Sequence, residues 1–164
     1  MRASLAFLAV AASTALASSS ALAEPPRSAE GIAVDASQVT PTEVLVLHAT
    51  QTGSPSIDPR IGNLPQLTKP PFSKKYDTYK FLDRKSLAVE RGKASVYTLP
   101  TGRLLQVTVE PAGTLYRVTA SISKDKSGAQ YLRVLEVTAP KGEPFFVAGQ
   151  SYDGGALVIA LTIK

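Results

Sequence analysis

Apolar and polar positions alternate along much of the second half of the chain. Residues 114–123 show the pattern most clearly, with Tyr116, Val118, Ala120 and Ile122 on one side and hydroxyl-bearing or charged residues on the other. A period of two residues predicts a β-strand that has one face in a core and the other in water. Further short runs of strand character, bounded by turn residues, cover residues 86–90, 93–99, 103–110, 130–138, 144–149 and 156–163.

Turn residues separate these runs and predict tight hairpins. Three of the turns are Pro-x-Gly tripeptides, in which proline presets φ for the first turn position and glycine accepts a positive φ where the chain returns. Eight or nine short strands at this spacing favour an all-β fold, mainly an antiparallel β-sandwich or a small barrel. The turns are Arg91-Gly92, Pro100-Thr101-Gly102, Pro111-Ala112-Gly113, Pro140-Lys141-Gly142 and Asp153-Gly154-Gly155.

The pattern is less regular before residue 86. Residues 43–50 form an apolar run that is typical of a buried strand. Asp58 followed by Pro59 is a favourable helix start, and later prolines prevent a long helix. We therefore expect one short helical insertion near residues 58–67, followed by a strand from about Tyr76.

The N-terminus has the order of features found in a secretory signal peptide. A positive start precedes an apolar, alanine-rich stretch, and Ala21-Leu22-Ala23 matches a cleavage site. We expect residues 1–23 to be a signal peptide, residues 24–42 a flexible leader, and residues 43–164 a single β-domain. The expected location is periplasmic or extracellular, and an integral membrane protein is not expected. The sequence has no cysteine, so disulfides, thiolate metal sites and a lipid-modified cysteine are excluded.

Positive charge is concentrated in residues 69–85. This segment holds six cations and two carboxylates, within a chain of formal charge +5. Lysines interleaved with aromatic residues can bind an anionic polymer by charge neutralisation and stacking, whereas lysines can also protect a sheet edge from aggregation. Export disfavours nucleic acid and leaves an envelope protein, an anionic polymer or a lipid surface as the expected partner. The contact residues expected from this pattern are Lys74, Lys75, Tyr76, Tyr79 and Lys80.

Catalytic chemistry has little support in the sequence. His48 is the only histidine, and a serine nucleophile with His48 and Asp58, Asp77 or Asp153 is conceivable, because such triads are defined by geometry. No G-x-S-x-G motif is present, and one imidazole makes a poor metal site. We expect no catalytic residues, no metal and no cofactor.

Several short motifs resemble a loose group of small exported bacterial β-domain proteins of unknown function. They include His48-Ala49-Thr50, Ile57-Asp58-Pro59, Pro71-Phe72-Ser73 and Leu99-Pro100-Thr101-Gly102-Arg103, and the last strand with Gly154-Gly155 and Leu157 completes them. The resemblance implies an exported β-domain over roughly residues 43–164 and assigns no catalytic or ligand residues.

Three functional hypotheses follow from these features. The leading one is a non-enzymatic, exported β-domain that binds or assembles with another envelope component, through residues 69–85 or through an exposed strand edge. The first alternative is a hydrolase of envelope polymers that uses His48. The second is a structural subunit of a surface assembly.

Overall fold

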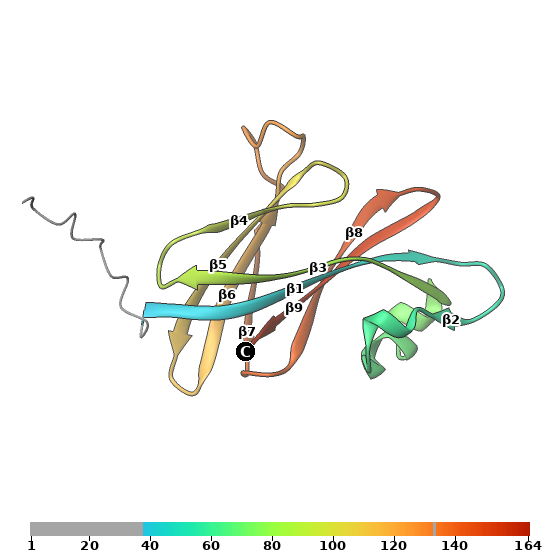
Figure 1. Ribbon diagram of the computed structural model, residues 1–164, viewed down its shortest axis with the longest axis horizontal. Coiled ribbons are helices and arrows are strands. Elements are labelled where there is room, and N and C mark those ends of the chain that lie inside the picture. The colour runs from blue at the N-terminus through green and yellow to red at the C-terminus, as the bar shows by residue number, and fades with distance from the viewer. Residues whose placement is uncertain (1–37, 133) are drawn as a thin grey trace, which may run out of the picture. The chain divides into compact units, whose positions relative to one another are not determined.

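Nine strands form two sheets in the computed structural model, which describes residues 38–132 and 134–164. Sheet A has the strand order β2-β3-β1-β9-β8, and sheet B has the order β4-β5-β6-β7 (Figure 1). The expected all-β fold is confirmed, and the two sheets form a sandwich. The strands are β1 Val39–Thr50, β2 Ser56–Ile57, β3 Thr78–Glu90, β4 Ser95–Thr98, β5 Leu104–Ala112, β6 Leu115–Ile122, β7 Leu135–Ala139, β8 Pro144–Tyr152 and β9 Gly155–Ile163.

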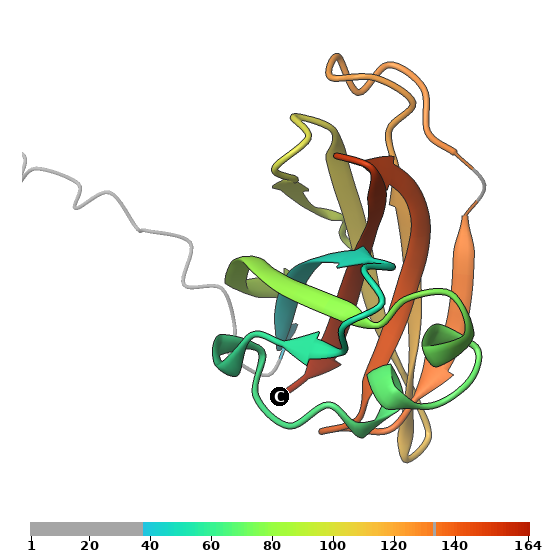
Figure 2. The same cartoon turned by 90° about the vertical axis from the view of Figure 1, so that its right-hand side faces the viewer.

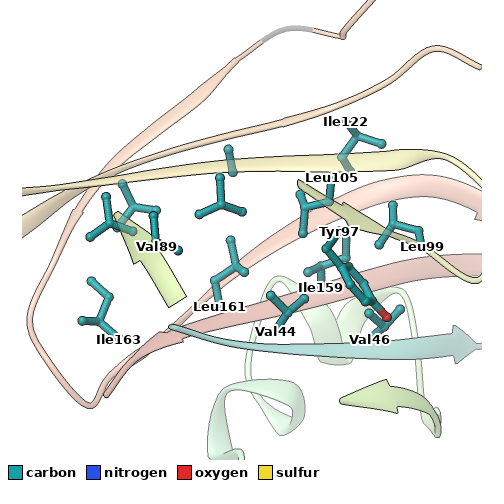
Figure 3. Close-up of a cluster of buried hydrophobic side chains, with 14 of the residues drawn as sticks. Val44, Val46, Val89, Tyr97, Leu99, Leu105, Ile122, Ile159, Leu161 and Ile163 are labelled. Carbon is teal, nitrogen blue, oxygen red and sulfur yellow. The ribbon is translucent and has the colours of Figure 1, made fainter. Parts of the chain in front are cut away.

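The main core lies between the two sheets. Val44 and Ile159 of sheet A belong to the same buried cluster as Leu105 and Ile122 of sheet B, and Figure 3 shows their side chains between the strands. Along β9, which confirms the strand expected over residues 156–163, every second residue enters this cluster: Leu157, Ile159, Leu161 and Ile163. Full burial of such a side chain contributes about 1.5–3 kcal/mol, so these alternating positions hold the sheets together.

A second core covers the opposite face of sheet A. Leu45 and Leu47 point away from sheet B and pack with Ile61 and Leu67 from the irregular segment between β2 and β3. Strand β1 is therefore buried on both faces, as its continuous apolar run predicts. This strand begins at Val39, before the expected domain start at Glu43.

Three short 3₁₀ helices make up this cover: η2 Pro59–Ile61, η3 Pro65–Thr68 and η4 Phe72–Lys74. Figure 2 shows them as short green turns beside β2. Prolines occupy the first turn of η2 and η3, where a missing N–H costs no hydrogen bond. The insertion is thus found where it was expected, but it continues past residue 67 and consists of separate 3₁₀ turns.

Two of the predicted hairpins are wrong. Arg91-Gly92 follows β3 of sheet A and leads into β4 of sheet B, and Pro140-Lys141-Gly142 connects β7 of sheet B to β8 of sheet A. Both turns therefore carry the chain from one sheet to the other. A glycine with positive φ specifies a local reversal of the backbone, but it does not determine which strand the next segment will pair with.

The other three turns are hairpins. Pro100-Thr101-Gly102 joins the paired strands β4 and β5, and Gly113 lies between β5 and β6. Asp153 and Gly154 join β8 to β9 with φ values of 41° and 71°. Positive φ at both central residues is the signature of a type I′ turn, whose twist matches that of the flanking strands.

The crossing from β3 to β4 is secured by a hydrogen bond between the sheets. The hydroxyl of Tyr97 on β4 donates to the carboxylate of Asp83 on β3. Burial, and then this carboxylate, raise the pKa of Tyr97 above its ordinary value, so the phenol remains a donor.

The predicted signal peptide and most of the predicted leader lie outside the described residues. Within residues 38–132 and 134–164, no helix has the length and apolar character required to cross a membrane.

Candidate functional site

A pocket of about 390 Å³ opens at the β2 edge of sheet A. It lies between β2, the start of β3 and the 3₁₀ helices that cover the sheet. Apolar and aromatic groups form most of its wall, and single hydroxyl and carboxylate side chains interrupt it. Its lining includes Ile57, Leu67, Ser73, Tyr76, Asp77 and Tyr79.

Tyr79 forms the inner wall of this pocket. Its side chain is only 2% exposed, and its hydroxyl donates a hydrogen bond to the backbone carbonyl of Leu67, 3.1 Å away. Burial raises the pKa of Tyr79, and the nearby Tyr76 and Asp77 add to the effect. Because the ring is packed in the second core, it supports the pocket but is not free to stack on a ligand from both sides.

Tyr76 lines the pocket, and Lys74 and Lys75 precede it in the chain without being lining residues. Tyr76 is half-buried, and its backbone N–H donates to the carbonyl of Phe72, the first residue of η4. Lys74 and Lys75 are exposed and lie in the chain between two lining residues, Ser73 and Tyr76. Both tyrosines therefore line one pocket, and the two lysines adjoin it in the chain.

Lys80 is separated from this group. It lies on β3 between Tyr79 and Phe81, whose side chains pack into the second core. Because successive strand residues point to opposite faces, Lys80 belongs to the other face of sheet A, where it is paired in register with His48. The predicted contact residues thus do not form one surface.

Asp77 anchors the loop that precedes β2. Its carboxylate accepts hydrogen bonds from the backbone N–H groups of Thr52 at 2.8 Å and Gly53 at 2.7 Å. The bond from Thr52 is the main reason that the pKa of Asp77 is lowered, and together with the other hydrogen bonds it outweighs the opposing effect of desolvation. The carboxylate stays ionised and occupied, which suits a structural anchor better than a proton-transfer group.

Asp58 is held in the same way on the neighbouring turn. It accepts from the backbone N–H of Arg60 at 3.0 Å, and its carboxylate also pairs with the Arg60 guanidinium at 2.6 Å. These contacts lower the pKa of Asp58 strongly. The same guanidinium lies 4.8 Å from the centre of the Phe81 ring, so Asp58 and Arg60 together fix η2 against β3.

His48 lies elsewhere, on the sandwich-facing side of sheet A. It is 6% exposed, and its ring meets the Tyr152 ring edge-on with centres 5.2 Å apart. Among the described residues, no hydrogen bond or ion pair joins His48 to Asp58, Asp77 or Asp153, and Nε2 has no hydrogen-bond partner. No group of three or more histidine, aspartate or glutamate side chains is placed to hold a metal ion in the part of the chain that the structure describes.

Ile57, Leu67 and Ser73 line the pocket but were not among the residues expected from the sequence. Leu67 follows Leu64 at a helical spacing of three residues, and this is the sequence signal that marks it as core. Nothing in that spacing shows that Ile57 and Leu67 would line the same pocket.

Comparisons with known proteins give no assignment: no family model, no curated protein and no solved structure matches this chain. The resemblance to exported β-domain proteins stays a prediction.

Proposed function

We propose that this protein is an exported, non-enzymatic β-domain that binds an anionic polysaccharide of the cell envelope through residues 69–85 and the adjoining pocket at the β2 edge of sheet A. The observation that carries this proposal is the position of Lys74 and Lys75, exposed beside a pocket whose walls include Tyr76 and Tyr79. Aromatic and aliphatic walls bind the apolar face of a sugar ring, and nearby lysines attract its charged substituents.

Negative charge lies in the lining of the pocket, and positive charge lies on residues next to it in the chain. Asp77 lies in the lining, and its ionised carboxylate repels an anionic group that approaches it. Lys69, Lys74 and Lys75 are exposed, and each is adjacent in the chain to a lining residue. A polymer of sugar rings that carry carboxylates suits this distribution of charge. The apolar face of one ring occupies the pocket, and its carboxylate lies beside the lysines, away from Asp77.

Two observations favour binding over hydrolysis. Asp58 and Asp77 are occupied by backbone and arginine hydrogen bonds, and His48 lies on the other face of sheet A. The hydrolase alternative needs one of these carboxylates to orient the imidazole.

The test compares two charge-reversed variants with the purified protein. Fluorescence anisotropy measures binding of a labelled polyuronate, with neutral dextran and anionic lipid vesicles as the other ligands. Lys74→Glu with Lys75→Glu removes the charges beside the pocket. Arg91→Glu with Lys141→Glu changes the net charge equally at exposed turn positions distant in sequence and is the matched control.

The first variant is expected to bind the polyuronate about tenfold more weakly, equivalent to about 1.4 kcal/mol, whereas the control keeps most of its affinity. Equal losses in both variants would show that only net charge matters. Preference for the vesicles would make lipid the partner, and equal binding of dextran would exclude a role for the charge. A size-exclusion profile that shows self-association would instead favour the structural-subunit alternative.

A further inference from the structure

A second pocket, also of about 390 Å³, lies at the β8 edge of sheet A. Three segments that are distant in sequence line it: Thr101 and Arg103 beside the β4–β5 turn, residues 124–126 after β6, and Gln150 with Ser151 on β8. Strands β2 and β8 are the two edge strands of sheet A. This pocket is therefore separate from the first pocket, which lies at the β2 edge.

Positive charge exceeds negative charge in this lining. Arg103, Lys124 and Lys126 contribute cations, and Asp125 is the only acid among the lining residues. Asp125 accepts hydrogen bonds from the backbone N–H of Ser127 at 2.9 Å and from the Ser127 hydroxyl. The Ser127 hydroxyl is the main cause of the lowered pKa of Asp125, so the acid is ionised but already has donors. The remaining cations favour an anionic ligand.

Hydrogen bonds fix the loop that presents these cations. The buried Ser123 hydroxyl accepts from the backbone N–H of Leu104 at 2.8 Å, which joins the loop to β5. The backbone N–H of Lys124 donates to the backbone carbonyl of Gln130 at 2.8 Å. The Lys124 Nζ donates to the side-chain Oε1 of Gln130 at 3.1 Å. The pocket is therefore largely formed before a ligand arrives, which lowers the entropic cost of binding.

Lys126 is held close to the β4–β5 turn. A Cβ built on Gly102 would lie 3.0 Å from Lys126 Cε, so the aliphatic part of the lysine passes over the glycine. The Pro-x-Gly turn thus provides both the hairpin and a surface that positions one cation of the pocket.

Gln150 provides an observation that is independent of charge. Both the nitrogen and the oxygen of its side-chain amide are buried, and neither has a hydrogen-bond partner among the described residues. Buried polar groups are nearly always paired, so an unpaired amide in a pocket lining calls for a partner that the protein does not supply. The amide has two N–H donors and a carbonyl oxygen that accepts, and a hydroxyl group, which both donates and accepts, is complementary to either end.

We infer that this pocket binds a small hydroxylated anion, that is, a sugar acid or a sugar phosphate. The anionic group is held by Arg103, Lys124 and Lys126, and a neighbouring hydroxyl pairs with the amide of Gln150. The volume lies within the range of small-molecule sites. The inference does not depend on polysaccharide binding at residues 69–85.

Isothermal titration calorimetry on the purified protein tests this site with glucose 6-phosphate, glucuronate, glucose and inorganic phosphate. At least one of the two hydroxylated anions is expected to bind more tightly than glucose and than inorganic phosphate. Gln150→Met keeps the length of the side chain, and Arg103→Gln removes one cation; each is expected to weaken binding about tenfold. The Lys74→Glu, Lys75→Glu variant is the matched control and keeps its affinity for the sugar anion.

The side-chain amide NMR signals of Gln150 give a second measurement that needs no variant, and they are expected to shift on titration with the bound anion. Failure of both hydroxylated anions to bind at millimolar concentration would overturn the inference. Equal binding of inorganic phosphate, unchanged affinity in folded Gln150→Met, or unshifted Gln150 signals would also overturn it.

Discussion

The hydroxyl of Tyr79 on β3 donates a hydrogen bond to the carbonyl of Leu67 in η3, 3.1 Å away. This bond joins sheet A to the 3₁₀ helices that cover it, and both side chains are almost fully buried in the second core. The same two residues line the pocket at the β2 edge of sheet A. The pocket wall is therefore part of the folded core, and its shape depends on the attachment of the cover to the sheet.

Tyr79→Phe keeps the ring and removes only the hydroxyl. The carbonyl of Leu67 then loses its donor in a buried place, so we expect a loss of about 1 kcal/mol in the free energy of unfolding. Urea denaturation measures the change. Tyr76→Phe, at a half-buried position, is the control and is expected to change stability less. Equal stability of Tyr79→Phe and the unmodified protein would show that the bond does not attach the cover.

Gly155→Ala tests the close approach of β9 to β1. A Cβ at this position would lie 2.3 Å from the backbone oxygen of Ala49 and 2.9 Å from His48 Nε2. Because backbone atoms cannot move aside cheaply, we expect a loss of about 3 kcal/mol or more in chemical denaturation. Gly92→Ala is the comparison, since it has open space but a φ of +70°, and its expected cost is about 1 kcal/mol. A smaller effect at Gly155 than at Gly92 would contradict the packing described for these strands.

Asp77→Asn tests the carboxylate that anchors the loop before β2. The folded protein lowers the pKa of Asp77 from its ordinary value of 3.8, so its stabilising effect is complete above that value and is lost as the pH falls through the folded pKa. The variant is expected to be less stable at neutral pH and to lose less stability on acidification. Thermal unfolding at a series of pH values measures both effects.

Asp153→Asn is the control for this experiment, because it removes an exposed carboxylate that accepts no hydrogen bond among the described residues. If Asp77→Asn and the unmodified protein lose stability in parallel as the pH falls, the carboxylate does not hold the loop in the way proposed.

Gln150→Met separates stability from binding at the second pocket. The substitution removes a buried amide whose two polar atoms are unpaired, so the ligand-free protein is expected to gain about 1 kcal/mol of stability. For a chain of this size the corresponding rise in Tm is about 2–4 °C. Gln51→Met, at an exposed position, serves as the comparison. A fall in Tm would show that the amide has a stabilising partner in the free protein.

Alternation along the strands made much of the sandwich predictable from the sequence. Leu157 and Ile159 recur at a spacing of two, and they occupy the core because a strand has only two faces. The pairing of strands could not be predicted in the same way. Glu90 and Ser95 flank a good turn sequence, yet their strands belong to different sheets, because pairing depends on which distant strands are available.

The candidate site was predictable only in part. Lys74, Lys75 and Tyr76 belong to one local turn, so their proximity follows from the sequence. Tyr79 and Lys80 are neighbours on a strand, and alternation alone places them on opposite faces once the strand is recognised. The spacing of Tyr76 and Tyr79 also fits a helix. Because the sequence does not decide between helix and strand here, it does not predict that Tyr79 and Lys80 lie on opposite faces. The unpaired amide of Gln150 depends on contacts among three distant segments, which no local pattern encodes.

The salt dependence of polyuronate binding tests the central claim most directly. If Lys74 and Lys75 contact carboxylates, the affinity of the unmodified protein falls steeply as salt concentration rises, because each contact releases counterions and added salt screens the charges. The Lys74→Glu, Lys75→Glu variant is then expected to show weaker binding and a shallower salt dependence than both the unmodified protein and the Arg91→Glu, Lys141→Glu control. Salt-independent binding, or the same affinity and the same slope in all three proteins, would contradict the proposed function.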